Sequence, residues 1–383
     1  MPQTIFQFLV SACLLTSLGY LAFAIVCVLR FSHPPGRRIA APPPVTILKP
    51  ICGLDAGLRD NLRTFCDQDY PCFQVIFGVA SSTDPAIPVI EAVIAEFPDR
   101  DLKLCIDART AGANLKVSNL ANIYPHASHD LILVADSDMR VGPDYLNAVV
   151  AALEDPRVGA ATCLYTGTAT GELASRLGAV FINEWFLPSV LVAHALQPIR
   201  FCFGATILIR RQLLDRIGGF ARLASVLADD YTLGRLVSAL GYKVQLSSYL
   251  VENVVKEANL RSLFLHELRW ARTVRTVQPY GYLLSFVTYP VPMALLYLAL
   301  APSPALGLGA VATAILLRLI MHRAAARRLQ DRQPISPWLL PLRDMLCFAV
   351  WGTSFLGRHV HWRHQTFAVN SNGDLSLEES QVT

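Results

Sequence analysis

Long apolar stretches without charged side chains lie near both ends of the chain. Residues 2–29 contain no charged side chain, and residues 8–29 are long enough to cross a bilayer as one helix. The basic lead-in of a secretory signal is missing, and the basic residues Arg30, Arg37 and Arg38 follow the stretch instead. The pattern predicts an uncleaved anchor whose C-terminal side lies in the cytoplasm.

The second uncharged stretch runs from residue 276 to residue 317. It is long enough for two helices, which are expected at residues 281–302 and 305–322. Pro302-Ser303-Pro304 lies between them and favours a tight connection. The pattern therefore predicts a membrane hairpin.

A third apolar segment, residues 338–357, contains two charged residues, Arg343 and Asp344. The two charges either pair within a span or mark a re-entrant segment, and the pattern leaves both open. Basic residues flank the segment on both sides: Arg323, Arg327, Arg328 and Arg332 before it, Arg358 and Arg363 after it. One full span cannot place both flanks in the cytoplasm, so the sequence leaves the topology here open.

Short apolar runs alternate with helix-like stretches between the two ends. Strands that alternate with helices predict an α/β fold with a mostly parallel sheet and right-handed crossovers. In such sheets ligands bind beyond the carboxyl ends of the strands. A stiff tether that includes Pro34-Pro35-Gly36 joins this domain to the anchor. The runs lie at 45–48, 75–79, 102–106 and 131–135, and the helix-like stretches at 58–66, 87–97 and 115–124.

The composition is typical of a protein that joins membrane helices to a folded domain of enzyme size. Of the 383 residues, 53% are hydrophobic and 16% charged, which is too apolar for an ordinary soluble protein. The net charge of +4 suits contact with anionic lipid head groups, and no basic run interleaves with aromatic residues, so a nucleic-acid partner is not expected. Nine cysteines occur singly, and Cys66 and Cys72 lack zinc-site spacing, which predicts structural thiols in a reduced compartment.

Asp136-Ser137-Asp138 follows the apolar run at 131–135. Alternate residues of an extended backbone point the same way, so both carboxylates can face one ion. Oxygen ligands suit Mg²⁺ or Mn²⁺, which proteins usually share with substrate phosphates. The triplet therefore predicts a divalent-cation site, although a polar strand end is the simpler alternative.

Asp229-Asp230 forms a second acidic pair, just before a helix-like stretch. One aspartate can cap that helix and another can occupy its first turn. Adjacent like charges beside apolar neighbours are costly unless one of them faces solvent or a ligand. The surplus carboxylate is a candidate general base for an alcohol acceptor.

Residues 260–277 are amphipathic and lead directly into the predicted hairpin, which is typical of an interfacial helix on anionic lipid. His266 and Arg269 lie one helical turn apart on one face of this helix. Such a pair of cations can hold a diphosphate, and Trp270 can provide a flat wall for sugar or lipid.

Other polar and glycine residues carry less information. Lys116 can reach a nucleotide or cap a helix start, and both readings stay open. Asp84 is favoured by turn chemistry alone. Nothing resembles a dinucleotide or phosphate loop, and Gly204 and Gly218-Gly219 are expected in turns.

Together, these motifs resemble those of membrane-bound nucleotide-sugar glycosyltransferases with the GT-A (Rossmann-like) fold, and within them the ceramide glucosyltransferase family (family 21). The resemblance covers residues 45–289. Within the family the chain is most similar to the branch that glycosylates bacteriohopanetetrol in hopanoid biosynthesis, through residues 114–120, 181–189 and 266–270. The motifs that carry the family resemblance are Leu48-Lys49-Pro50 with Gly53, Asp84, Asp136-Ser137-Asp138, Asp229-Asp230 and His266 with Arg269-Trp270.

The resemblance implies a division of the chain. Residues 1–30 would be the anchor, 31–44 the tether and 45–259 the GT-A domain. The interfacial helix at 260–278, a membrane region with two to three transmembrane or re-entrant helices at 279–357 and a tail at 358–383 would follow.

The resemblance also implies roles for the donor-side residues. Asp84 would bind the uracil ring of a UDP-sugar, and Lys116 would reach the nucleotide. Asp136 would lie near the nucleotide and sugar and share the divalent cation (Mg²⁺ or Mn²⁺) with Asp138. Asp229 would adjoin the base, Asp230.

The Arg-Trp motif of the family would correspond to Arg269 and Trp270, near the diphosphate and the acceptor. His266 stands where the motif usually opens with Gln or Arg, and would add charge at the diphosphate. The implied reaction is an inverting displacement in which Asp230 takes the proton of a lipid hydroxyl.

The expected substrates are UDP-N-acetylglucosamine and bacteriohopanetetrol, at a bacterial inner membrane with the catalytic domain in the cytoplasm. Ceramide glucosylation from UDP-glucose is the nearby alternative. A processive polysaccharide synthase is disfavoured, because too few helices follow the catalytic domain to frame a polymer channel. A non-catalytic membrane scaffold or lipid carrier is the alternative from another class.

Overall fold

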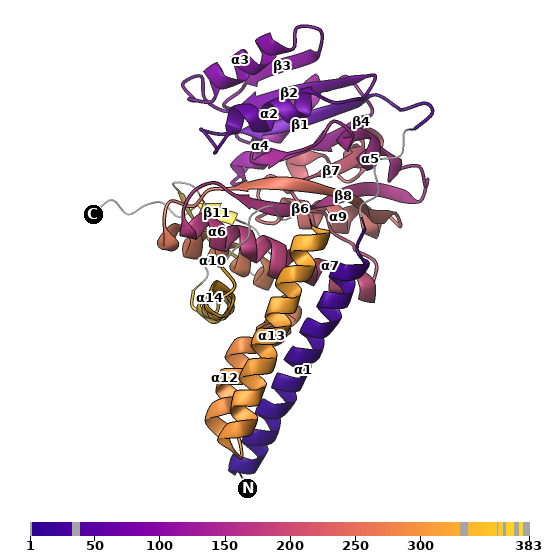
Figure 1. Ribbon diagram of the computed structural model, residues 1–383. Coiled ribbons are helices and arrows are strands. Elements are labelled where there is room, and N and C mark those ends of the chain that lie inside the picture. Colours follow the sequence, from indigo (N-terminus) through magenta and orange to yellow (C-terminus); the bar gives the residue numbers. More distant parts are fainter. Residues whose placement is uncertain are drawn as a thin grey trace, which may run out of the picture. The chain divides into compact units, whose positions relative to one another are not determined.

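The computed structural model describes residues 2–32, 39–329, 336–357, 359–362, 365–370 and 375–377. Pro34-Pro35-Gly36, Arg37, Arg38, Arg332, Arg358 and Arg363 lie outside these residues. The chain forms two compact units (Figure 1). The sheet unit comprises Ser32–Thr166, Gln197–Val255 and Phe367–Thr383, and the helical unit comprises Met1–Phe31, Gly167–Leu196 and Lys256–Thr366.

The sheet unit contains a mixed eight-stranded sheet in the order β3-β2-β1-β4-β7-β6-β8-β5. The first four of these strands are parallel, whereas β7 runs antiparallel to β4 and β6, and β5 antiparallel to β8. The predicted parallel portion is confirmed. The strands are β1 Val45–Ile51, β2 Phe73–Val79, β3 Asp101–Ile106, β4 Leu131–Val134, β5 Met139–Arg140, β6 Val158–Ala169, β7 Ile207–Arg210 and β8 Lys243–Val255.

Helices connect the parallel strands as the alternating pattern predicts. Every residue of β1 is buried, which is expected of a central strand with helices on both faces. The core includes Ile47, Phe65, Phe77 and Leu133. The helices of this unit are α2 Leu58–Cys66, α3 Ile87–Glu96, α4 Leu115–Ile123, α5 Tyr145–Ala151, α8 Arg211–Arg216 and α9 Asp229–Ala239, with 3-10 turns η1 Tyr124–His126 and η3 Phe220–Leu223. Near the C-terminus, β10 Gln365–Val369 pairs antiparallel with β11 Leu375–Leu377.

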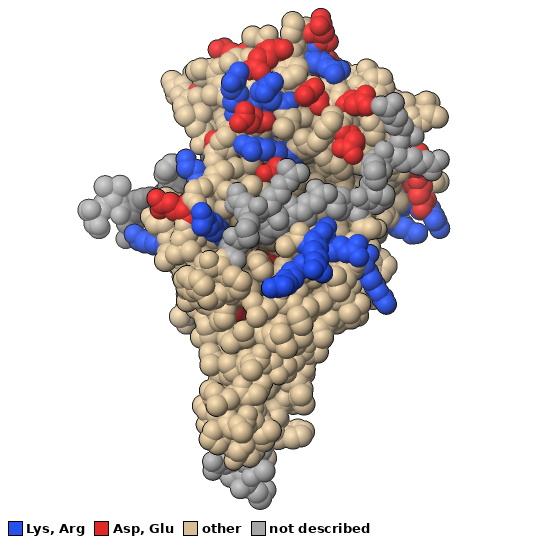
Figure 2. Space-filling view, viewed as in Figure 1, with Lys and Arg blue, Asp and Glu red and all other residues tan. Residues whose placement is uncertain are grey.

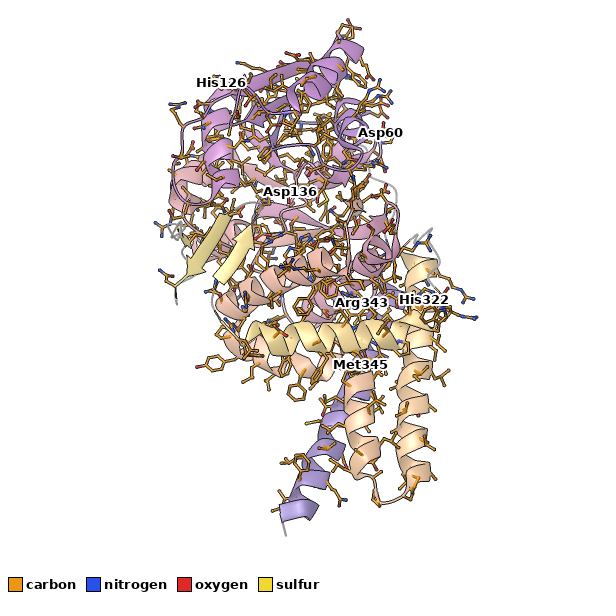
Figure 3. All side chains as sticks on the ribbon, turned by 90° about the vertical axis from the view of Figure 1, so that its left-hand side faces the viewer. Asp60, His126, Asp136, His322, Arg343 and Met345 are labelled. Carbon is orange, nitrogen blue, oxygen red and sulfur yellow. The ribbon has the colours of Figure 1, made fainter. Side chains whose placement is uncertain are left out.

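The helical unit holds the apolar ends of the chain. Helices α1, α12 and α13 lie side by side (Figures 1 and 3), and Leu14, Met293 and Ala314 pack in one cluster between them. The face of these helices seen in Figure 2 carries no charged residue over most of its length. The elements of this unit are α1 Pro2–Arg30, α6 Leu173–Phe181, a π-helical turn η2 Ile182–Phe186, α7 Leu187–Leu196, α10 Leu260–Val277, α11 Pro279–Leu284, η4 Ser285–Thr288, α12 Pro290–Leu300, α13 Pro304–Arg328, α14 Leu339–Ser354 and β9 His359–Trp362.

By length and composition, three helices among the described residues can cross a membrane: Ile5–Arg30, Leu173–Leu196 and Pro304–Arg328. The anchor and the second arm of the hairpin are thus confirmed as long apolar helices. The prediction of the first arm as one helix at 281–302 is wrong in detail. The arm is split into Pro279–Thr288 and Pro290–Leu300, which meet at a bend of 66°. Pro290 begins the second piece, where a proline lacks the N–H that would continue the first.

Helix α14 corresponds to the third apolar segment and lies across the bundle (Figure 3). It has 16 residues and is not among the helices long enough to span a membrane. Arg343 and Asp344 do not pair with each other, because neighbouring residues of a helix point in different directions. Arg343 instead donates to Glu267 at 2.5 Å, and Asp344 accepts from Arg318 at 2.6 Å. Each charge of this segment thus has its partner on another helix, Glu267 on α10 and Arg318 on α13.

Candidate active site

The carboxylates of the predicted metal triplet follow β4 in the sheet unit, where Figure 3 labels Asp136. Asp138 is fixed at the start of β5: its backbone oxygen accepts from Val254, and its Oδ2 accepts from the Asn253 side chain at 2.9 Å. Its Oδ1 is buried and has no hydrogen-bond partner within the described residues. Burial and the neighbouring carboxylates of Asp136 and Asp55 raise the pKa of Asp138 to about 6. A buried carboxylate oxygen left without a donor is a site where a cation is stabilised.

Two lysines compensate Asp136 from different sides. Lys116 places its Nζ 2.5 Å from Asp136 Oδ1, and Lys49 donates to the Asp136 backbone oxygen at 2.5 Å. Lys49 is fully buried in β1 and lies 3.6 Å from the centre of the Phe65 ring. Burial lowers the pKa of Lys49 to about 7, against the opposing effect of the acidic residues nearby. Lys116 does not cap α4, because the side chain of Asn114 accepts from Val117 and performs that role.

Asp229 and Asp230 are the first two residues of α9, and neither caps the helix, since Ala228 occupies the N-cap. Both oxygens of Asp230 accept backbone hydrogen bonds, Oδ2 from Gly204 at 2.9 Å and Oδ1 from Tyr231 at 2.7 Å. Burial and then the charge of Asp229 raise the pKa of Asp230 to about 6. The pair thus lies in the first turn of α9, where burial raises the pKa of both carboxylates, and does not cap the helix.

Lys116 also brings the two acidic motifs together. Its Nζ lies 4.0 Å from Asp229 Oδ2 as well as 2.5 Å from Asp136 Oδ1. Burial alone would lower the pKa of Lys116, but the carboxylates of Asp136 and Asp229 raise it above its usual value. Two motifs that are about ninety residues apart in the sequence therefore share one partly exposed cation, the ammonium group of Lys116.

Gly204 lies in a turn, as expected from the sequence, and this turn also forms part of the cluster. Its backbone N–H donates to Asp230, and a Cβ at this position would lie 2.8 Å from Asp136 Oδ2 and 3.2 Å from Lys116 Nζ. A side chain here would have to displace the Asp136 carboxylate and the Lys116 ammonium group. The close approach explains the glycine.

Asp84 follows β2 and closes the loop after β1. Its carboxylate accepts from the backbone N–H of Gly53, with distances of 3.1 and 2.9 Å, and from Ala86 at 2.8 Å. Gly53 adopts a positive φ of 71°. The structure thus joins two of the motifs noted in the sequence, and it gives Asp84 the turn role expected from its neighbours.

The third motif lies on α10 of the helical unit, a helix with the predicted bounds and a capping box between Asn259 and Ser262. His266 Nδ1 lies 2.7 Å from Glu257 Oε1. The centres of the His266 and Trp270 rings are 4.4 Å apart, and Phe181 stacks on Trp270 at 6.1 Å. Trp270 therefore contacts two other rings, while Arg269 lies one turn from His266.

Comparison with known proteins identifies the family. The sequence profile of glycosyl transferase family 21 matches residues 9–375. The chain belongs to this family.

Curated relatives of this family 21 chain are ceramide glucosyltransferases. Ceramide glucosyltransferase 3 of Caenorhabditis elegans is 27% identical over 234 residues, which cover 60% of this chain and 50% of the relative. Ceramide glucosyltransferase of Komagataella phaffii is 37% identical over 124 residues, or 30% of this chain and 24% of the relative. The chain thus matches about half the length, or less, of these relatives.

A solved structure shares the fold of this family 21 protein. Mannosyltransferase PcManGT from Pyrobaculum calidifontis, in complex with GDP-Man and Mn²⁺, has a TM-score of 0.57 at 20% identity, covering 93% of this chain and 99% of that chain. The likeness confirms the predicted GT-A fold, with apolar helices at both ends of the chain.

The family 21 site fits a divalent cation at one position. Asp138 Oδ1 is the buried oxygen that lacks a donor, whereas Asp136 Oδ1 contacts Lys116. Among the described residues, no three His, Cys, Asp or Glu side chains form a cation-binding group. The protein would therefore supply only part of the coordination, as is usual for a cation shared with substrate phosphates.

Sequence reasoning missed several residues of the site. Lys49 was noted only as part of a motif, although a charged residue inside a buried strand is itself a signal of a specific partner. Glu257 and Asn253 gave no local signal, because their partners lie 9 and 115 positions away. Asp55, which accepts a hydrogen bond from the Ser137 hydroxyl, also gave no local signal in the sequence.

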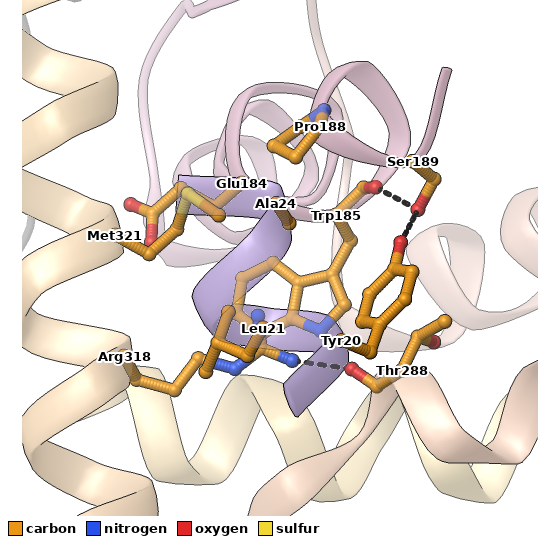
Figure 4. Close-up of a pocket in the computed structure, with 10 residues that line it drawn as sticks. All are labelled: Tyr20, Leu21, Ala24, Glu184, Trp185, Pro188, Ser189, Thr288, Arg318 and Met321. Carbon is orange, nitrogen blue, oxygen red and sulfur yellow. Dashed lines mark hydrogen bonds between the residues drawn. The ribbon is translucent and has the colours of Figure 1, made fainter. Parts of the chain in front are cut away.

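A small pocket in the helical unit is lined by residues that hold the helices together (Figure 4). Arg318 donates to the Thr288 backbone oxygen at 2.7 Å, and its guanidinium lies 4.1 Å from the centre of the Trp185 ring. Tyr20 and Ser189 share a hydrogen bond of 2.9 Å on the other wall. The pocket admits little more than a water molecule, so a sugar or a lipid head group does not fit.

Proposed function

We propose that this protein is a membrane-bound inverting glycosyltransferase that moves a sugar from a UDP-sugar to a hydroxyl of a lipid. UDP-N-acetylglucosamine and bacteriohopanetetrol are the preferred substrates. The observation that carries the proposal is the cluster of Asp136, Asp229 and Asp230 around Lys116, beside the free oxygen of Asp138. It lies beyond the carboxyl ends of parallel strands, where α/β sheets bind ligands.

In this proposal Asp230 is the base. Its carboxylate is held by two backbone N–H groups, and a pKa of about 6 leaves it ionised at neutral pH while keeping it a better proton acceptor than an exposed aspartate. It takes the proton of the lipid hydroxyl as the oxygen attacks the anomeric carbon. The bond to UDP breaks on the opposite side, which inverts the configuration.

The other residues bind the donor. Asp84 would contact the uracil ring, and Lys116 and Arg269 would neutralise charge on the departing diphosphate. Asp138, with Asp136, would hold a divalent cation, which supplies further positive charge to the diphosphate. The mannosyltransferase of the same fold is described with GDP-Man and Mn²⁺, and we extend the use of a nucleotide-sugar and such a cation to this chain.

The membrane supplies the acceptor in this proposal. Helix α10 would lie at the surface of the bacterial inner membrane, and the sheet unit would face the cytoplasm, where UDP-sugars occur. Binding a donor from water beside an acceptor from lipid contributes positioning, so no covalent enzyme intermediate is required.

Ceramide glucosylation from UDP-glucose is the second candidate. The names of the curated relatives favour it. Both candidates use the same carboxylates, and they differ in which lipid and which sugar the chain accepts.

The deciding experiment incubates the purified full chain in lipid nanodiscs with labelled UDP-N-acetylglucosamine or UDP-glucose, and with bacteriohopanetetrol or ceramide. We expect label in bacteriohopanetetrol from UDP-N-acetylglucosamine. Label in ceramide and none in the hopanoid would reverse the order of the candidates. In cells that lack the protein, lipid mass spectrometry should show the unglycosylated acceptor accumulating.

Variants separate an enzyme from a scaffold or lipid carrier. Asp138→Asn and Asp230→Asn should abolish transfer at normal expression, while Asp99→Asn, an exposed residue of the same unit, should retain it. Full turnover by both site variants would falsify the enzymatic proposal.

A further inference from the structure

The pair formed by Glu257 and His266 is not explained by donor binding. Glu257 lies just before α10, and its side chain is 9% exposed. Its backbone N–H donates to the Ser175 hydroxyl at 2.9 Å, which fixes the loop against α6. The backbone from which the Glu257 side chain extends is thus held in place.

The pair determines which nitrogen of His266 carries the proton. Burial opposes ionisation of Glu257, but its hydrogen bonds with His266 and Ser262 outweigh that effect and lower its pKa. An ionised carboxylate only accepts, so Nδ1 of His266 must donate across the distance of 2.7 Å. In the neutral imidazole, Nε2 then carries a lone pair and is a hydrogen-bond acceptor.

The His266 imidazole is partly exposed. The side chain is 38% exposed, and Nε2 has no hydrogen-bond partner among the described residues. In the neutral imidazole, Nε2 offers no N–H to the oxygens of a diphosphate. It suits a hydroxyl, which donates.

An aromatic wall adjoins the His266 ring, on a helix that also carries Arg269. Trp270 lies 4.4 Å from the His266 ring, and Phe181 stacks on Trp270. Arg343, which pairs with Glu267, lies 5.0 Å from the centre of the Phe181 ring and supports it from α14. On the same helix Leu265 is 39% exposed. A hydrogen-bond acceptor beside a rigid apolar wall matches a molecule that carries hydroxyls on an apolar body.

We propose that Nε2 of His266 accepts a hydrogen bond from a hydroxyl of the lipid acceptor, with Glu257 fixing the imidazole tautomer and Trp270 packing against the apolar part of the same lipid. This inference rests on the proposed function for the identity of the acceptor. It places His266 on the acceptor side of the reaction and not at the diphosphate.

Two substitutions of His266 distinguish the two ring nitrogens. The amide nitrogen of asparagine falls near Nδ1, so His266→Asn keeps a donor for Glu257 and removes the group at Nε2. The longer glutamine places its amide near Nε2, so His266→Gln restores an acceptor oxygen there. His194→Asn, on an exposed position of α7, is the matched control.

Steady-state kinetics in nanodiscs should give separate KM values for bacteriohopanetetrol and for UDP-N-acetylglucosamine. We expect His266→Asn to raise the acceptor KM about tenfold, the effect of one lost hydrogen bond, and to leave the donor KM unchanged. His266→Gln should recover most of the loss. An unchanged acceptor KM in His266→Asn, or a higher donor KM instead, would overturn the inference.

A binding measurement without turnover separates failure of this inference from failure of the proposed function. Tryptophan fluorescence should report tighter binding of bacteriohopanetetrol than of the parent hopanoid hydrocarbon, which has no hydroxyl, in the wild-type protein. His266→Asn should lose this discrimination, and its retention would overturn the inference. Discrimination by the wild type without sugar transfer would leave the hydroxyl site in place and reject the proposed reaction.

Discussion

Lys116 lies 2.5 Å from Asp136 and 4.0 Å from Asp229, so a single ammonium group joins two acidic motifs that are far apart in the chain. Without it, buried carboxylates would repel each other across the same small volume. The lysine is therefore both a structural counter-ion and a group placed to meet the phosphates of a donor.

Replacing this lysine should damage the site more than the fold. We expect Lys116→Met to lower kcat/KM at least about a hundredfold and to destabilise the protein by about 1–3 kcal/mol, because carboxylates lose their counter-ion in a partly exposed site. Transfer assays and thermal unfolding in detergent measure the two effects. Lys103→Met, at an exposed position of β3, should change neither. Wild-type turnover by Lys116→Met would contradict this role.

The pH dependence of the reaction should reflect Asp230. Burial and Asp229 raise its pKa to about 6, and a base acts only in its ionised form. The value of kcat/KM should therefore rise as pH increases through about 6 and level off above it. Rate profiles between about pH 5 and pH 8 test this. A rate that falls as pH rises through this range would exclude an ionised Asp230 as the base.

The parallel half of the fold was predictable because its signals are local. The apolar runs at 45–48 and 131–135 and the helix at 58–66 appear in the structure within a few residues of their expected bounds. Strand β5, with two residues, has no pattern of its own and exists because it pairs with β8. The antiparallel half depends on such partners far along the chain.

The candidate site, too, was predictable only where its signals are local in the sequence. Asp136, Asp138, Asp229 and Asp230 were recognisable as acidic pairs beside predicted elements. The place of Gly204 in the site was not, since only the three-dimensional approach of Asp136 and Lys116 shows which groups a side chain there would displace. Arg343 and Asp344 were noticed as charges in an apolar segment, but their separate partners on α10 and α13 could not be read from spacing.

The ion pair between Arg343 and Glu267 makes a prediction about stability. Both side chains are almost completely buried, at 0% and 3% exposure. Arg343→Met leaves Glu267 buried without a counter-ion, which should cost about 3–5 kcal/mol of unfolding free energy. The double substitution Arg343→Met with Glu267→Leu should recover much of that loss. Thermal unfolding in detergent measures both, with Arg327→Met, an exposed residue of α13, as the control. Equal loss in the single and double variants would show that the charge pairing is not the cause.

The expected cytoplasmic location of the sheet unit can be tested with the protein's own thiols. None of the nine cysteines forms a disulfide, and Cys52 and Cys72 are exposed residues of the sheet unit. A maleimide that cannot cross membranes should label them in inside-out vesicles and not in intact spheroplasts. Cys52→Ser with Cys72→Ser should abolish this labelling, and detergent should equalise the two preparations for the wild type. Labelling of the wild type in sealed spheroplasts would place the sheet unit on the outer side of the membrane, away from the supply of UDP-sugars.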